Sequence, residues 1–201
     1  MKFGNISKLL DFKFVRFFLR QLLNEARETH KIYLLLRKEP SLNIGKSVRI
    51  YSPERLVVGK NVVIQEGTIL HCGGRDWCDY GGGIRIGDDS LISPYCIFEG
   101  GGGIEVGERL VCGPHVKISS NRACYDAELI GLKNEKRHLK EVTIGNDVVL
   151  FGGVTVDSGV NIGNGAVIGA GSVVLSDIPN REVWAGIPAK FVKKRGEDKI
   201  S

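Results

Sequence analysis

Residues 144–174, with the sequence IGNDVVLFGGVTVDSGVNIGNGAVIGAGSVV, carry an aliphatic side chain at every sixth position. The repeated residues are Ile144, Leu150, Val156, Ile162, Ile168 and Val174. Small or branched residues follow the first five after four positions, namely Val148, Val154, Val160, Ala166 and Ser172. This spacing differs from the period of about 3.6 of a helix and of about two of a strand. It predicts a solenoid in which a short strand and its turn use six residues and stacked coils bury the aliphatics.

The same spacing extends toward the N-terminus, where it begins near Leu42 and is interrupted three times. The register shifts at residues 73–83 and 100–103, and both segments contain glycine clusters. Neither cluster matches a GxxxxGK[ST] loop or a strand–GxGxxG–helix unit, so we predict corner turns rather than phosphate sites. The aliphatic and apolar residues that keep the spacing are Ile44, Ile50, Val58, Ile64, Leu70, Ile86, Ile92, Phe98, Val106, Cys112 and Ile118.

The third interruption is the largest. From Ile118 to Ile144 the chain uses 26 residues where one repeat needs six, an excess of twenty. Long excursions from a rigid scaffold are where binding and catalytic residues concentrate. We therefore expect an extruded loop over residues 119–143 that contributes to the functional site.

The ends of the chain lie outside the repeats. We predict a basic amphipathic helical segment over residues 1–40, the solenoid over 41–178 and a coil over 179–201. Residues 1–39 contain nine Lys and Arg against four Asp and Glu, so the whole net charge of +5 lies there. A basic helix with an apolar face can lie on an anionic membrane surface. The alternative is that its apolar face packs on the solenoid or on a neighbouring subunit.

We expect a cytoplasmic protein. If the helical segment binds lipid, the protein would lie at the inner face of the membrane. The five cysteines form an odd set, and Cys96 and Cys112 occupy repeat positions for small apolar residues. We therefore expect reduced, buried thiols. No signal-peptide pattern follows Met1, and the longest apolar run near it, Ile32 to Leu36, is too short to span a bilayer.

The repeat motifs and the C-terminal motifs of the chain together resemble those of a known family. The C-terminal repeats end in IGAGSVV (168–174), DIP (177–179) and AGIPAK (185–190). With these motifs, residues 42–195 resemble the hexapeptide-repeat acyltransferases, in the branch of maltose, galactoside and surface-polysaccharide O-acetyltransferases. The repeat motifs are Ile44-Gly45, Val58-Gly59, Ile86-Gly87, Val106-Gly107, Ile144-Gly145, Ile162-Gly163 and Ile168-Gly169.

The resemblance implies a left-handed parallel β-helix, so we expect a mainly β chain to which the helical segment and the extruded loop are added. It implies transfer of an acetyl group from the co-substrate acetyl-CoA to a carbohydrate hydroxyl, with no metal and no nucleic acid. It also implies a homotrimer with an active site at each subunit interface, where loop 119–143 closes over the acceptor of a neighbouring site.

Such a transfer needs a base, because a protonated sugar hydroxyl is a poor nucleophile, and histidine is suited to that role. In the family, the histidine follows a repeat that runs here from Val106 to Ile118, and an ungapped count places it at residue 123. This chain has Ala123, whose side chain cannot move a proton. Three explanations are open: a deliberate substitution, a natural lack of the base in a weak enzyme or binding subunit, or a different histidine. The other histidines considered are His115, His138 and His71.

Residues for the coenzyme carry over position by position from the resemblance. Gly152 and Ala170 match positions that line the groove for the pantetheine arm, which larger side chains would block. Packing of the repeat explains these two equally well. Ser176 and Lys190 match positions near the nucleotide end of the groove, where Lys190 can pair with phosphates or be a plain surface lysine. Trp184 can stack on the adenine or cover the last coil.

Acceptor and acid–base candidates lie nearer the extruded loop. Asp126 and Glu99 are carboxylates that can orient the base or bind sugar hydroxyls, and a solvated surface role is the alternative for both. Candidates for acceptor contacts are Tyr95, Asn121 and His138, and packing in the core or at an interface is the alternative for Tyr95.

Other functions remain open at this point. An amino-sugar N-acetyltransferase is the nearest, and a non-catalytic protein that binds coenzyme A or a glycan is favoured if Ala123 is natural. A γ-class carbonic anhydrase on the same solenoid requires converging histidines, but the fifth residue after His115 is Ser120.

Overall fold

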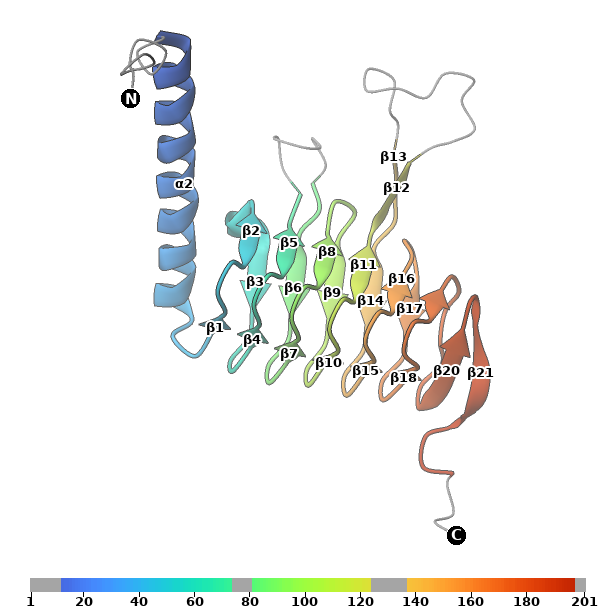
Figure 1. Ribbon diagram of the computed structural model, residues 1–201. Helices are drawn as coiled ribbons and strands as arrows, with labels where there is room; N and C mark the ends of the chain where they lie inside the picture. Colours follow the sequence, from blue (N-terminus) through green and yellow to red (C-terminus); the bar gives the residue numbers. More distant parts are fainter. Residues whose placement is uncertain (1–11, 74–80, 124–136, 198–201) are drawn as a thin grey trace, which may run out of the picture.

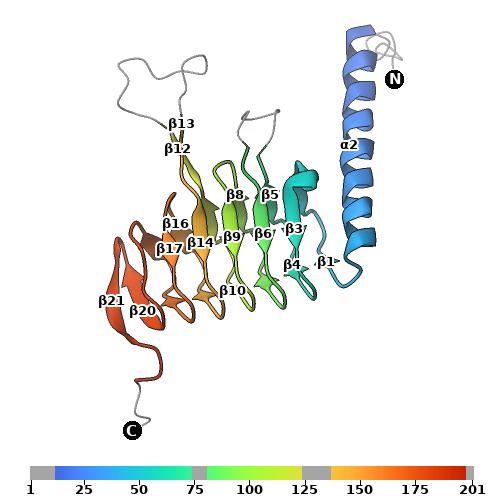
Figure 2. The same ribbon diagram turned by 180° about the vertical axis from the view of Figure 1, so that it is seen from behind.

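The computed structural model describes residues 12–73, 81–123 and 137–197. Three parallel sheets made of short strands wrap into one left-handed β-helix, and the helix α2 (Phe12–Lys38) stands beside its N-terminal end (Figures 1 and 2). The mainly β fold with an N-terminal helix, predicted from the six-residue spacing and the resemblance, is confirmed.

Each coil contributes one strand to each of three sheets, named A, B and C in the order in which the chain visits them. Sheet A contains β1 (Asn43–Ile44), β4 (Val63–Ile64), β7 (Leu91–Ile92), β10 (Val111–Cys112), β15 (Val149–Leu150), β18 (Val167–Ile168), β20 (Glu182–Gly186) and β21 (Ala189–Lys194). Sheet B contains β2 (Arg49–Tyr51), β5 (Ile69–His71), β8 (Ile97–Glu99), β11 (Lys117–Ser119), β16 (Thr155–Val156) and β19 (Val173–Val174). Sheet C contains β3 (Leu56–Val58), β6 (Ile84–Ile86), β9 (Ile104–Val106), β14 (Val142–Ile144) and β17 (Asn161–Ile162).

Strand register reproduces the spacing of the sequence. Val149 pairs with Val167, which is 18 residues later and equals three six-residue units. Val111 pairs with Val149, which is 38 residues later and therefore twenty more than one regular coil needs. The extra residues, like those at 73–83 and 100–103, follow a strand of sheet B and precede the next strand of sheet C along the chain. The part of the extra segment that is described forms a hairpin of β12 (Asn121–Ala123) and β13 (Arg137–Leu139).

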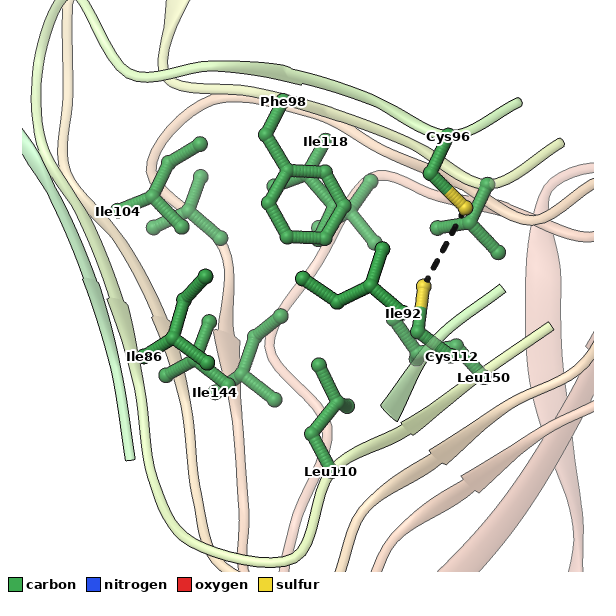
Figure 3. Packing of buried hydrophobic residues seen from close by; sticks show 14 of the residues in the cluster. Ile86, Ile92, Cys96, Phe98, Ile104, Leu110, Cys112, Ile118, Ile144 and Leu150 are labelled. Carbon is green, nitrogen blue, oxygen red and sulfur yellow. Dashed lines mark hydrogen bonds between the residues drawn. The ribbon is translucent and has the colours of Figure 1, made fainter. Parts of the chain in front are cut away.

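The repeated apolar residues fill the interior of the solenoid. All six aliphatics from Ile144 to Val174 are at most 3% exposed, and the five residues of the second set are at most 2% exposed. Phe98 is the largest fully buried side chain and lies among Ile92, Ile104 and Ile118 in the middle coils (Figure 3). The core is therefore the one predicted from the spacing.

Three of the five cysteines belong to this core. Cys72, Cys96 and Cys112 are buried and free, as predicted, and Cys78 and Cys124 lie outside the described residues. The Sγ atoms of Cys96 and Cys112 are 3.8 Å apart (Figure 3). Burial raises the pKa of the Cys72 thiol to about 12, so this side chain stays protonated and behaves as a small apolar residue.

Glycine at the corner between sheets B and C allows neighbouring coils to stack closely. A Cβ at Gly82 would lie 2.1 Å from the carbonyl oxygen of Gly100 and 2.3 Å from that of Gly101. Residues 100–103 form the turn between β8 and β9. Corner packing thus accounts for these clusters, as the sequence indicated.

Both ends of the solenoid are covered, as open coils would otherwise expose the core. At the C-terminal end the prediction of a coil over residues 179–201 is wrong for residues 182–194, because β20 and β21 pair there as an antiparallel hairpin. Trp184 of this hairpin pairs with Ile168 and packs against the core. The last coil thus gains a strand that the six-residue spacing does not reveal.

At the N-terminal end, α2 packs through its C-terminal half. Ile32, Leu35 and Leu36 lie against the core, and Lys31 forms an ion pair of 3.4 Å with Glu54 of η1 (Pro53–Arg55). The solenoid of the same chain does not cover the preceding apolar side chains. Those exposed are Phe14, Val15, Phe17, Phe18, Leu19, Leu22 and Leu23. Within the described ranges, no helix is both long enough and apolar enough to cross a membrane.

Candidate active site on the outer face of sheet B

The third residue of four consecutive sheet B strands forms a polar row on the outside of the solenoid. In each strand the middle residue is buried, so the residues on either side of it point outward. Register places Tyr51 beside His71, His71 beside Glu99, and Glu99 beside Ser119. Neighbouring strands are about 4.8 Å apart, so adjacent side chains of this row are within contact distance. We call these four residues the sheet B row.

Glu99 is the centre of the contacts in this row. Its Oε2 accepts a hydrogen bond of 2.8 Å from Ser119 Oγ and lies 3.7 Å from Lys117 Nζ. The Glu99 side chain is 23% exposed, so the carboxylate is partly shielded yet reachable from solvent. The sequence predicted Glu99 as an acid–base candidate. It did not single out Ser119 or Lys117, although both occupy outward positions of the neighbouring strand and could have been found from the strand period.

His71 lies between an aromatic ring and this carboxylate. Its imidazole stacks on Tyr51 with ring centroids 5.2 Å apart and an interplanar angle of 27°. Burial lowers the pKa of His71, and the negative charge of Glu99 opposes that shift only in part. The neutral imidazole is therefore favoured, which is the form that can accept a proton.

Asn121 continues the polar surface from Ser119 into the hairpin. It is 6% exposed, and its Oδ1 accepts a hydrogen bond of 2.7 Å from Arg137 Nη1. Because a guanidinium only donates, this contact fixes which end of the amide faces Arg137. Asn121 Nδ2 is buried and has no hydrogen-bond partner among the residues that the structure describes. A buried donor without a partner is costly and often marks a place where a ligand or water binds.

A groove of about 510 Å³ lies beside these residues, on the side of the C-terminal coils. An ion pair of 3.3 Å between Arg122 and Asp157 crosses one part of it. The groove is lined by Glu99, Lys117, Ser119, Asn121, Arg122, Arg137, Thr155, Val156, Asp157, Val173 and Leu175. Charged and hydroxyl groups thus surround a hollow that can hold a polar ligand.

Residue 123, where the sequence comparison with the family expects a base, ends β12 next to this groove. Ala123 pairs with Arg137, and Arg122 pairs with His138 on the exposed side of the hairpin. Asp126 lies outside the described residues. The structure therefore brings Glu99 and Asn121 together near position 123, and places His138 on the adjoining strand.

The two predicted pantetheine positions occupy one corner, between sheets A and B. Gly152 and Ala170 each follow a sheet A strand by two residues, and Gly171 N donates to Gly152 O at 2.9 Å. Gly152 and Ala170 are therefore two small residues on adjacent coils of the same corner. Tyr95 and His115 lie at the same corner in earlier coils, where their rings stack with centroids 5.5 Å apart. Tyr95 is 52% exposed, so it is a surface residue at this corner rather than part of the core.

The remaining coenzyme candidates lie toward the C-terminal end. Ser176 is exposed after β19, at the opposite edge of sheet B from Ala170. Lys190 is exposed on β21 and pairs with Ala185. Trp184 donates from Nε1 to Glu182 Oε2 at 2.7 Å and packs on the last coil, so its visible role is to cover the core.

A larger groove of about 750 Å³ runs along sheet C, but its polar groups serve the stacking of coils. The side chains of Asn164 and Asn180 accept hydrogen bonds from backbone N–H groups of Asn146 and Asn164, at 2.8 and 2.7 Å. Among the described residues, no three His, Cys, Asp or Glu side chains gather in a way that could hold a metal ion. The described surface thus offers sheet B as the place for acid–base chemistry.

Comparisons with known proteins agree with this architecture. No protein-family model matches the chain. A protein of Saccharomyces cerevisiae that is assigned as an acetyltransferase is 39% identical over 120 residues, which is 59% of this chain. The match spans 59% of the length of that relative.

Solved structures share the fold. A maltose O-acetyltransferase from Clostridium difficile is 28% identical with a TM-score of 0.54, over 78% of this chain and 67% of the other. The N-acyltransferase AntD from Bacillus cereus, in complex with dTDP and 3-hydroxybutyryl-CoA, has a TM-score of 0.65 at 22% identity. That likeness covers 77% of this chain and 80% of AntD.

Proposed function

We propose that this chain, whose sequence and fold are similar to those of hexapeptide-repeat acetyltransferases, transfers the acetyl group of acetyl-CoA to a carbohydrate hydroxyl. The observation that carries the proposal is the sheet B surface, where Glu99, Ser119 and the buried amide of Asn121 border a polar groove. Carboxylate, hydroxyl and amide groups are the partners that sugar hydroxyls need for hydrogen bonding.

For the coenzyme, we propose a path along the corner between sheets A and B. Small residues at Gly152 and Ala170 leave room there for a thin pantetheine arm, and Lys190 supplies a positive charge toward the nucleotide end. Ser176 and Trp184 are further candidates for the nucleotide end at the last coil, with Ser176 at the opposite edge of sheet B from this corner. The maltose O-acetyltransferase of the same fold supports the choice of acetyl donor and sugar acceptor.

In this proposal, the alanine at position 123 lowers the rate of acetyl transfer. An alanine there cannot take the proton of the acceptor hydroxyl, so transfer is slower than in relatives with histidine at that position. Asp126 and His138 belong to the same extruded segment and are proposed to contact the acceptor. Tyr95, at the corner shared with Gly152, is proposed to contact it from a neighbouring subunit of a homotrimer.

Transfer of radiolabelled acetyl groups from acetyl-CoA to a panel of nucleotide sugars, lipid-linked saccharides and oligosaccharides tests the proposal. Saturable transfer to a hydroxyl acceptor is expected. Ala170→Trp is expected to abolish it by filling the coenzyme corner, and the exposed Lys46→Ala on the first coil is the matched control that leaves it unchanged. Binding of coenzyme A without transfer to any acceptor would instead identify a binding protein.

A second candidate is an amino-sugar N-acyltransferase. The fold likeness to AntD, an N-acyltransferase solved with dTDP, favours this alternative. The same panel decides between the two, because an amide product resists mild alkali whereas an acetyl ester is released by it.

We also propose that α2 holds the protein at an anionic membrane surface. Its uncovered apolar residues, such as Phe18 and Leu22, share the helix with Arg16, Arg20 and Arg27. Co-sedimentation with vesicles containing phosphatidylserine is expected, and reversal of these three arginines to glutamate should abolish it. Equal binding to neutral vesicles would contradict an electrostatic contribution.

A further inference from the structure

We propose that His71, positioned by Glu99 and Tyr51, is the general base for the acceptor hydroxyl in this chain. The inference rests on the proposed acyltransferase function and assigns the proton transfer that Ala123 cannot perform. The base is then found two coils from Ser119, on the same outward row, rather than in the extruded loop.

Geometry supports this role from two sides. The Tyr51 ring stacks on the imidazole from one neighbouring coil, and Glu99 lies beside it on the other. Ser119 and Lys117 both approach Oε2 of Glu99 and hold this carboxylate on the strand next to His71. A carboxylate held in this way fixes the orientation of an imidazole and stabilises the imidazolium that forms during proton transfer.

The other described histidines lack this setting. His30 lies on α2 and stacks on Tyr33. His115 stacks on Tyr95 at the corner between sheets A and B. His138 is exposed on β13 and pairs with Arg122. His71 is the one for which the structure shows a carboxylate on the neighbouring strand at the same register position.

The charges around His71 are consistent with a base near neutral pH. Among the described residues, the titratable groups at the same register position on the neighbouring strands are Tyr51 on β2 and Glu99 on β8. Burial lowers the pKa of His71 and Glu99 raises it, with burial as the larger effect. The imidazole is therefore largely neutral at pH 7 and gains a proton only as the acceptor loses its own.

The reaction balances without any further reagent. His71 takes the proton of the acceptor hydroxyl while the oxygen attacks the thioester carbonyl, and a tetrahedral intermediate forms. The C–S bond then breaks, the imidazolium returns its proton to the sulfur, and the products are the acetyl ester and the free thiol of coenzyme A. Asn121 Nδ2, which is buried and has no partner within the described part of the chain, is a donor that can bind an oxygen in this groove.

The test compares acetyl transfer by the full chain and by His71→Gln, with His30→Gln as the matched control on α2. Transfer should fall at least tenfold in His71→Gln and stay unchanged in His30→Gln. Imidazole added to His71→Ala should restore part of the lost rate, which a purely structural defect would not permit. Titration of the histidine Cε1–H resonances, assigned with these variants, should show a lower pKa for His71 in Glu99→Gln than in the natural chain.

The outcomes separate this inference from the function on which it rests. If a folded His71→Gln variant transfers acetyl groups within twofold of the rate of the unsubstituted chain, the role of His71 is overturned and the acyltransferase proposal stays intact. An unchanged His71 pKa in Glu99→Gln overturns the pairing of these two side chains. A natural chain that neither binds nor consumes acetyl-CoA overturns the proposed function, and the base assignment with it.

Discussion

Ser119 Oγ lies 2.8 Å from Oε2 of Glu99 on the neighbouring coil, and 2.8 Å from the backbone carbonyl oxygen of Asn121. One hydroxyl thus links the carboxylate in the middle of the sheet B row to the start of the hairpin that carries position 123. The geometry of the row and that of the extruded segment are therefore coupled through a single side chain.

Ser119→Ala should lower the turnover number for acetyl transfer about tenfold, because the carboxylate loses a hydrogen bond and a bond to a charged group contributes about 1.5–3 kcal/mol. Ser119→Thr keeps the hydroxyl and should retain most of the activity. Steady-state kinetics and coenzyme A binding measure the two effects separately. A loss of coenzyme A binding in Ser119→Ala would show that the residue acts on the donor site instead.

The pH dependence of transfer should report His71. The rate is expected to rise with pH as the imidazole loses its proton, at a pKa below the usual histidine value of about 6.5, because burial disfavours the charged form. Glu99 favours the protonated imidazole, so Glu99→Gln should move this rise to lower pH. Rate profiles of both proteins measure the shift, and a rise that moves to higher pH would be inconsistent with the pairing.

Ala123→His should restore transfer in the His71→Gln background, by ~10²-fold, because it places an imidazole where the family has its base. β12 carries this position beside the groove that Glu99 and Asn121 line. Ala123→Gln is the control of similar size that cannot act as a base at neutral pH. Recovery with glutamine as large as with histidine would mean that position 123 acts through packing alone.

Phe98→Ala should reduce the free energy of unfolding by about 3–5 kcal/mol, because removing a fully buried aromatic ring leaves a cavity in the middle coils. Phe17→Ala changes a side chain of α2 that is 60% exposed and should shift stability by no more than about 0.5 kcal/mol. Urea unfolding at one fixed protein concentration measures both. Equal effects of the two substitutions would contradict the assignment of the core.

The sequence predicts most of the solenoid because one physical requirement repeats in it. Each coil must bury its aliphatic at the same place, so the residues from Ile144 to Val174 set the strand register. The excess of twenty residues counted before Ile144 is also found in the structure, because Val111 pairs with Val149, 38 residues later instead of 18. The C-terminal hairpin was missed because β20 and β21 follow no six-residue spacing. They are stabilised by pairing with each other and by Trp184 on the last coil.

The candidate site was predictable only in part. Glu99 and Asn121 were among the candidates named from the sequence, and the structure places both beside the sheet B groove. The contact of Glu99 with Ser119, and the position of His71 beside it, join residues on coils that are 20 and 28 positions apart along the chain. Insertions of unequal length separate these coils, so only strand register could bring the three residues into one row.

Binding of acetyl-CoA, measured by isothermal titration calorimetry, tests the central claim most directly because it needs no knowledge of the acceptor. We predict saturable binding to the natural chain, weakened at least tenfold by Ala170→Trp and left unchanged by Lys46→Ala. The absence of saturable binding, or binding that Ala170→Trp does not weaken, would contradict a coenzyme site at the corner between sheets A and B.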